Sequence, residues 1–388
     1  MSGLLVNGIP IARIFGLEIR VHISWVFIIA IITVGTADQL SALHPEWSDA
    51  VLWGAAGAVA FLFFASVLIH ELAHGLAAQR RGLEGGSVTL LFFGGTTALA
   101  QDTATPGDEA AIAAAGPIAS LGLGVLFLAA WQAAALGSGT AADAVSQLGL
   151  ILGVLNLLLG VLNLVPVFPL DGGRVLRAVL WRTMGDESRA NRFVAALSRM
   201  VGYGLVALGF LLAFADDAIN GVMLVLSGWF LASAARSVER RAMLEQLLRG
   251  VRVETVMEKD LPEVSPQLTL DTFAAQFLDG NRATSLPVVR DRIMLGLIGI
   301  SQLRRIRRGA WPTTRAADVM VSPPTLPTLG PDDELWSALE RLRRTGLDGL
   351  PVMRGAELLG ILTRRSVVAA VQSRARPLTG AGAAPAGQ

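Results

Sequence analysis

Three long stretches of this chain contain no lysine or arginine, and this charge pattern limits the fold more than any other feature. The stretches cover residues 21–79, 82–173 and 200–235, whereas the C-terminal third is crowded with arginine. Of the 388 residues, 53% are hydrophobic and only 16% are charged, which is too apolar for an ordinary soluble enzyme. The pattern predicts a polytopic α-helical membrane half followed by a soluble part.

Basic residues collect on the cytoplasmic side of membrane proteins, so the arginine clusters orient the spans. We expect six spans, with both termini on the cytoplasmic side of a cell membrane. The expected spans cover residues 21–40, 51–79, 110–135, 145–168, 196–215 and 219–236. Residues 1–20 are expected to form a partly extended N-terminal segment or hairpin at the membrane surface, with no cleavable signal peptide. The membrane domain is then expected over residues 21–240.

The second expected span carries His70-Glu71-Leu72-Ala73-His74 near its C-terminal end. Helical residues four apart point in nearly the same direction, so two imidazoles at this spacing can bind one zinc ion. The Glu beside the first imidazole can take a proton from a metal-bound water. Charge is expensive in lipid and indicates function there. A structural His pair is the alternative, but two of the chain's four His lie in this pentapeptide.

A third ligand candidate follows the fourth expected span. Pro166 and Pro169 break the helix, so Asp171 lies in an irregular segment on the same side of the membrane as the His pair. Its carboxylate could complete a site of two His and one Asp that leaves a position open for water. A turn that ends the helix is the alternative role. The chain has no Cys, which excludes thiolate metal sites.

Residues 86–100 are β-branched and aromatic and too short to span the membrane as a helix. We expect a strand or hairpin beside the active site, where backbone that is not helical is shielded by protein or faces water. Its free edge could hold a substrate as an added strand. An amphipathic surface loop is the alternative. His22, at the mouth of the first span, is expected to be interfacial, and the small residues around Gly116-Pro117 predict close helix packing.

From Val251 onward the pattern becomes that of a soluble α/β protein, and it repeats after 63 to 64 residues. Such a repeat predicts two similar units, residues 251–308 and 315–372, packed against each other. The Gly-, Ala- and Pro-rich residues 373–388 are expected to be disordered. The matching pairs are Val256-Met257 with Val319-Met320, and Leu286-Pro287 with Leu350-Pro351.

The membrane half resembles the site-2 protease family of intramembrane zinc metalloproteases. The resemblance rests on His70-Glu71-x-x-His74, on Gly116-Pro117, and on Asn163 ahead of Leu170-Asp171-Gly172, in this order. It implies that His70, His74 and Asp171 hold one zinc ion and that Glu71 is the catalytic base. It also implies that Asn163 helps to position the substrate or the oxyanion.

The same resemblance implies that Phe93, Gly94 and Gly95 belong to a strand that cradles the substrate. The implied substrates are membrane proteins with a single span, such as anti-sigma factors or membrane-tethered regulators already trimmed by another protease. The resemblance thus implies regulated intramembrane proteolysis, in a bacterial or archaeal inner membrane.

The repeat resembles a pair of cystathionine-β-synthase (CBS) domains, which often bind adenine nucleotides. Thr363 is then the candidate nucleotide contact, but its counterpart in the first repeat is Gly299. Gln302 and Ser366 replace the Asp expected to contact the ribose. This departure argues against a bound nucleotide and leaves a structural role, or homodimerisation through the CBS pair, as the alternative. In either case we expect the pair to regulate access to the site.

Two other classes of function stay open from the residues alone. Intramembrane His and Asp can line an ion path, so a CBS-regulated metal-ion or solute transporter is the alternative to an enzyme. A catalytically inactive membrane scaffold is the third interpretation. The formal net charge of +1 gives no case for nucleic acid as a partner.

Overall fold

The structure of this chain is a computed structural model. It describes residues 8–83, 87–91, 94–98, 103, 105–215, 217–259, 261–278, 285–291, 293–323, 325–355 and 357–379. The chain divides into two compact units, Met1–Glu239 and Arg240–Gln388.

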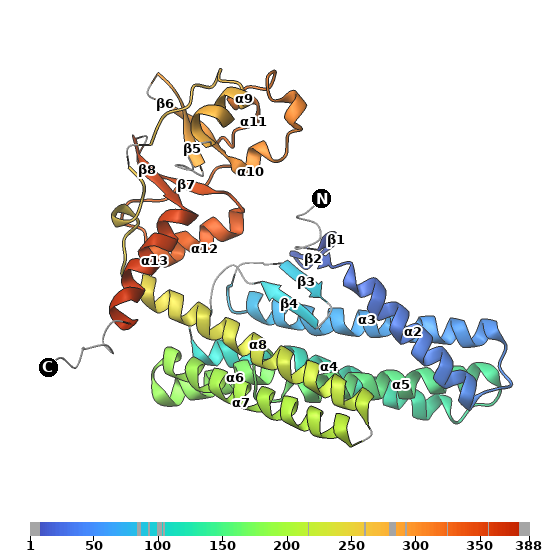
Figure 1. The fold of residues 1–388 in the computed structure, drawn as a ribbon. Helices are drawn as coiled ribbons and strands as arrows, with labels where there is room; N and C mark the ends of the chain where they lie inside the picture. The colour runs from blue at the N-terminus through green and yellow to red at the C-terminus, as the bar shows by residue number, and fades with distance from the viewer. Residues whose placement is uncertain are drawn as a thin grey trace. The chain divides into compact units, whose positions relative to one another are not determined.

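The described residues contain six helices that are long and apolar enough to cross a membrane (Figure 1). They confirm the predicted fold of a polytopic helical membrane protein. The fourth helix ends at Asn163 rather than at 168, because the segment that follows contains Pro166 and Pro169, which have no N–H to donate. The helices are α2 (Ser24–Leu43), α3 (Asp49–Gln79), α4 (Pro106–Ala134), α5 (Thr140–Asn163), α7 (Glu187–Phe214) and α8 (Ala218–Leu248).

A shorter amphipathic helix, α6 (Asp171–Met184), lies between α5 and α7 in the chain. Its first turn packs directly on the backbone of the loop that precedes it. A Cβ added at Gly172 would lie 2.2 Å from the carbonyl oxygen of Leu164, and one at Gly173 would lie 2.6 Å from the carbonyl carbon of Val167. Only glycine therefore fits directly after Asp171, which fixes the start of α6 against the loop.

Four strands form one small sheet in the first unit, in the order β1-β2-β3-β4 (Figure 1). β2 pairs antiparallel with β1 and parallel with β3, and β3 pairs antiparallel with β4. The expected hairpin within residues 86–100 is thus confirmed for its described part, and the surface-loop alternative is wrong. The strands are β1 (Ile9–Ile14), β2 (Leu17–Val21), β3 (Ser87–Leu91) and β4 (Gly94–Ala98).

The sheet packs on the helices that carry the His pair and the first span. Leu17, Ile19, Val88 and Leu90 are fully buried and form one core with side chains of α2 and α3. Gly75 on α3 leaves the room that Leu17 occupies, since an added Cβ would lie 2.4 Å from its side chain. The N-terminal segment is therefore a structural part of the membrane unit.

The second unit contains the predicted repeat as two antiparallel hairpins, β5–β6 and β7–β8. Both hairpins carry a register shift at the equivalent place, after Val288 and after Val352. The strands are β5 (Ser285–Arg290), β6 (Ile293–Gly299), β7 (Gly349–Arg354) and β8 (Glu357–Thr363). The helices are η1 (Val253–Thr255), α9 (Leu270–Phe273), η2 (Ala274–Leu278), α10 (Ile300–Leu303), η3 (Arg308–Ala310), α11 (Ala316–Val319), α12 (Leu335–Thr345) and α13 (Arg364–Thr379).

The stretch that opens each repeat pairs with the hairpin of the other repeat. Glu258 pairs with Ile361 of β8, and Val321 pairs with Leu297 of β6. The two repeats therefore pack against each other, as expected. Helix α13 runs on to Thr379, beyond the expected start of a disordered tail at residue 373, because helix-forming Ala and Arg continue as far as 376.

Candidate metal centre

Three side chains from two helices bring one ligand atom each to the same point. His70 and His74 lie on α3 and are each 3% exposed, and Asp171 is the first residue of α6. The Oδ2 atom of Asp171 lies 3.2 Å from Nε2 of His70 and 3.2 Å from Nε2 of His74. The two Nε2 atoms are 3.3 Å apart.

These distances fit a tetrahedral zinc ion. With zinc bonds of about 2.0–2.1 Å, the ligand atoms of a tetrahedral site are about 3.3–3.4 Å apart. The three observed distances form a nearly equilateral triangle of that size, which is one face of such a tetrahedron. Two imidazoles and one carboxylate are also a donor set that zinc accepts in enzymes, with the fourth position open.

The outer nitrogen of each imidazole is held by α4. Nδ1 of His74 donates to the carbonyl oxygen of Ile112 at 2.8 Å. Nδ1 of His70 lies 2.8 Å from Oγ of Ser120, which is fully buried. A hydrogen bond at Nδ1 sets the tautomer and turns the lone pair of Nε2 toward a metal.

Gly116 leaves the space in which an ion can lie. A Cβ added at this position would lie 2.3 Å from Nε2 of His74 and 2.7 Å from Nε2 of His70. Any other residue would therefore fill the room beside the ligand atoms. The predicted close packing around Gly116-Pro117 is confirmed, but what packs against Gly116 is the His pair.

The environment of Asp171 favours its charged form. Burial by itself would raise the pKa of this carboxyl, but the imidazoles of His70 and His74 beside it outweigh burial and hold the pKa well below its ordinary value. A carboxylate that stays ionised is the form that binds a metal.

Glu71 is buried next to the ligand triangle. One of its carboxylate oxygens lies within 4.8 Å of a ring nitrogen of each of the two His. A carboxylate at this distance can reach a water that stands beside the ligand atoms. Its role as general base stays a prediction.

The other predicted site residues lie in different settings. Asn163 is the last residue of α5, is half-buried, and donates from Nδ2 to the carbonyl oxygen of Leu159 at 2.9 Å. Gly94 and Gly95 begin β4, opposite Leu91 and Leu90 of β3. Phe93 lies outside the described residues.

His22 has a structural setting of its own. It lies just before α2, and its Nδ1 is 2.9 Å from Oγ of Ser24. Its backbone N–H donates to the carbonyl oxygen of Leu90 in β3. Sequence reasoning missed the tasks of Ile112 and Ser120, although the spacing of Gly116 and Ser120 by one helical turn was a usable signal.

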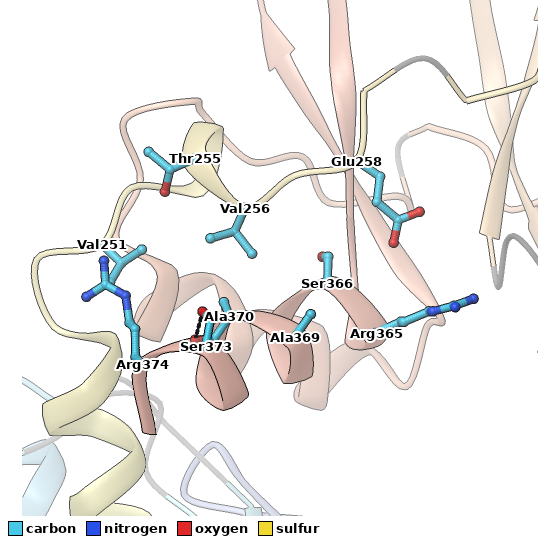
Figure 2. Close-up of a pocket in the computed structure, with 10 residues that line it drawn as sticks. All are labelled: Val251, Thr255, Val256, Glu258, Arg365, Ser366, Ala369, Ala370, Ser373 and Arg374. Atoms are coloured by element: carbon cyan, nitrogen blue, oxygen red, sulfur yellow. Dashed lines mark hydrogen bonds between the residues drawn. The ribbon is translucent and has the colours of Figure 1, made fainter. Parts of the chain in front are cut away.

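The second unit contains a cavity of about 960 Å³ (Figure 2). Figure 2 shows Thr255, Val256 and Glu258 of the opening stretch facing Ser366, Ala369 and Ala370 of α13 across it. Two arginines of α13, Arg365 and Arg374, complete its lining.

The predicted nucleotide contacts are engaged with protein groups. Thr363 is fully buried, and its hydroxyl donates to Oε1 of Glu258 at 2.5 Å. In the first repeat, the buried Gln302 accepts a hydrogen bond from the N–H of Gly299 at 2.9 Å. Gln302 therefore caps its own helix at the position where a ribose contact was expected.

Comparisons with known proteins agree on both halves of the chain. The family model described as Peptidase family M50 matches residues 58–140 and 131–209, and the model described as CBS domain matches residues 316–373. Rip3 of Mycobacterium tuberculosis is 37% identical over 372 residues, which is 93% of this chain and 92% of that protein. The Synechocystis protein sll0528 is 29% identical over 95% of this chain and 97% of its own length. Both carry the name of a zinc metalloprotease.

Among solved structures, the site-2 protease from Methanocaldococcus jannaschii is 28% identical. The match covers 60% of this chain and 95% of that chain, with a TM-score of 0.41.

Proposed function

The chain belongs to peptidase family M50, and on this basis we propose that it cleaves peptide bonds inside the membrane-spanning segments of other proteins. The family, the similar proteins and the six apolar helices identify it as a zinc metalloprotease of the membrane. The observation that carries the proposal is the triangle of ligand atoms from His70, His74 and Asp171, with Glu71 beside it.

Each side chain has a separate task in this proposal. His70, His74 and Asp171 would hold a zinc ion, whose chemistry would be to lower the pKa of a water and to polarise the scissile carbonyl. Glu71 takes the proton of the attacking water and returns it to the leaving amine. Its burial in the membrane unit keeps bulk water away from this proton transfer.

The substrate must be extended before it is cut, because the carbonyl groups of a helix are hydrogen-bonded to its own N–H groups. β4 is the last strand of the sheet and packs beside α3, the helix of the His pair. We assign the substrate to this edge as an added strand. Asn163, at the end of α5, is assigned to orient the substrate or the developing oxyanion.

A direct test compares the wild-type chain with Glu71→Gln in proteoliposomes that contain a substrate with one membrane span. We expect cleavage by the wild type and at least a 1,000-fold slower reaction, on the order of the loss of a catalytic base, for Glu71→Gln. Glu46→Gln is the matched control, since Glu46 lies in the exposed loop between α2 and α3. Full cleavage by Glu71→Gln would remove Glu71 from the mechanism, and metal flux without peptide products would identify a transporter.

We further propose that the second unit regulates the enzyme and that both termini lie in the cytoplasm. Two arginines, Arg365 and Arg374, are among the residues that line the cavity between α13 and the stretch that opens the first repeat, and a guanidinium group suits the phosphates of an adenine nucleotide. The hydrogen bond between Thr363 and Glu258 would have to open for Thr363 to contact that ligand.

Calorimetric titration of the full chain with ATP and AMP tests this regulatory proposal. A binding signal that Arg365→Gln weakens at least tenfold would support a nucleotide site in this cavity. No signal with either nucleotide would favour homodimerisation through the CBS pair, which the mass of the chain in detergent would then report.

A further inference from the structure

A buried carboxylate outside the ligand set lies close to the metal centre. Glu109, in the first turn of α4, is only 1% exposed. A buried charge destabilises a protein unless it is paired, so the role of Glu109 is sought in its partners. The mechanism proposed above gives this residue no task.

Both ionic partners of Glu109 come from α6, the helix that begins with Asp171. Its Oε1 atom lies 3.1 Å from Nε of Arg174 and 2.7 Å from Nη2 of Arg177. These two arginines are three residues apart and therefore share one face of α6. The hydroxyl of Thr103 donates to the other oxygen, Oε2, at 2.5 Å. The carboxylate thus joins the start of α4 to the start of α6.

This joint lies one helical turn from a ligand. Asp171 precedes Arg174 by three residues, so a shift of the Arg174 backbone moves the carboxylate of Asp171 with it. α6 has 14 residues and is not one of the six candidate spans, so its side-chain contacts with α4 add to the backbone packing at Gly172 and Gly173 in holding it in place. Metal sites tolerate errors of only ~0.2 Å in ligand distance.

One face of α4 contacts both imidazole ligands and also the helix that carries Asp171. Glu109, Ile112, Gly116 and Ser120 follow one another at intervals of three or four residues, which places them in one row. Ile112 and Ser120 hold the outer nitrogens of His74 and His70, and Gly116 leaves the room between them. For the third ligand, Asp171, the contact runs through its helix, since Glu109 pairs with Arg174 and Arg177 of α6.

We infer that Glu109 is a positioning residue, which holds Asp171 at coordinating distance by anchoring α6 through Arg174 and Arg177. The inference rests on the proposed zinc ligands. It predicts that zinc binding depends on Glu109 only as long as Asp171 is a ligand.

A double-mutant cycle on the purified full-length chain tests this dependence, with zinc affinity measured by competition with a chelator. We expect Glu109→Gln to weaken zinc binding at least tenfold, which is the usual range for an outer partner of a metal ligand. In the Asp171→Asn background the same change should alter zinc binding less than twofold. Equal losses in both backgrounds would mean a general distortion and would overturn the inference, as would no loss in either.

A second pair of variants covers the case in which Glu109→Gln does not fold. Arg177→Gln removes the shorter of the two ion pairs, whereas Arg177→Lys keeps a positive charge at the same place. We expect the Gln variant to weaken zinc binding about tenfold and the Lys variant to keep most of the affinity. Equal affinities for the two variants would overturn the inference.

Asp108→Asn is the matched control. Asp108 lies in the same turn of α4 and is also paired to an arginine, but its partner is Arg81 after α3, at 3.0 Å. It should keep the zinc affinity of the wild type within twofold. All these measurements need no substrate, so a chain that binds zinc and cleaves nothing would refute the proposed function alone. If Glu109→Gln left the zinc affinity unchanged, only this inference would be refuted.

Discussion

Two helix contacts in the first unit are both made at glycine, but the glycines have different roles. On α4, Gly116 faces the ring nitrogens of His70 and His74. Between α7 and α8, Gly202 and Gly228 face backbone: a Cβ at Gly228 would lie 2.4 Å from the carbonyl oxygen of Gly202. The contact at Gly116 makes room for a metal ion, whereas the contact between Gly202 and Gly228 lets two helices approach closely.

The difference lies in what surrounds each glycine. Two buried polar residues, Glu109 and Ser120, lie in the same row of α4 as Gly116. Glu109 pairs with Arg174 of α6, and Ser120 hydrogen-bonds to His70 of α3. Polar side chains inside a membrane cost free energy, and where they occur they usually belong to a functional site. A glycine in a helix contact therefore indicates a binding site only when the side chains that it faces can bind a ligand.

The comparison predicts the largest effect for Gly116→Ala. The added methyl group would lie 2.3 Å from Nε2 of His74, so the imidazoles must turn away from each other. We expect a loss of zinc affinity of about 100-fold, near the upper end of the range for changes next to metal ligands. Zinc competition on the purified chain measures it. Unchanged affinity would show that Gly116 only brings helices together, as Gly228 does.

The second prediction concerns Ser120→Ala, which removes the partner of Nδ1 of His70. Without this hydrogen bond the ring can rotate and change its tautomer, so we expect zinc affinity to fall roughly 10-fold to 100-fold. Ser120→Thr keeps the hydroxyl and should recover part of the loss. Ser227→Ala is the control, because the hydroxyl of Ser227 donates to the carbonyl oxygen of Met223 on its own helix. Equal affinities for Ser120→Ala and the control would contradict the role of Ser120.

How far the sequence leads is clear from these same elements. Six spans follow from charge gaps and apolar runs, because both are local patterns that lipid enforces. The His pair follows from helical spacing within one segment. The repeat in the second unit follows from matching strands, and the comparisons agree with this half of the fold.

The missing parts are contacts between distant segments. No local pattern states that residues 9–21 and 87–98 form a single sheet, since strand pairing depends on how the helices between them pack. The ion pairs of Glu109 with Arg174 and Arg177 join residues more than 60 positions apart in the sequence. They can be recognised only once the packing of α4 against α6 is known. In sequence, Glu109 belongs to an ordinary polar turn before a span.

The third prediction moves to the contact between α7 and α8. Gly228→Ala puts a methyl group against the backbone of Gly202, so the helices must separate. We expect a loss of about 1–2 kcal/mol in the free energy of unfolding, as for an overpacked contact. Zinc affinity should stay within twofold of the wild type, since the site lies on α3, α4 and α6. A tenfold loss of zinc affinity would mean that the contact between α7 and α8 is coupled to the metal centre.

The smallest effect is expected at the end of the same contact, in Tyr203→Phe. Nη1 of Arg236 on α8 donates to the hydroxyl of Tyr203 on α7 at 2.8 Å, and both side chains are exposed. Because water or lipid headgroups can replace an exposed hydrogen bond, its loss should cost about 0.5–1 kcal/mol at most. Thermal unfolding of the wild type and the variant in the same detergent measures the difference. A loss larger than that of Gly228→Ala would show that polar contacts at the helix ends hold α7 to α8, and that close backbone packing is secondary.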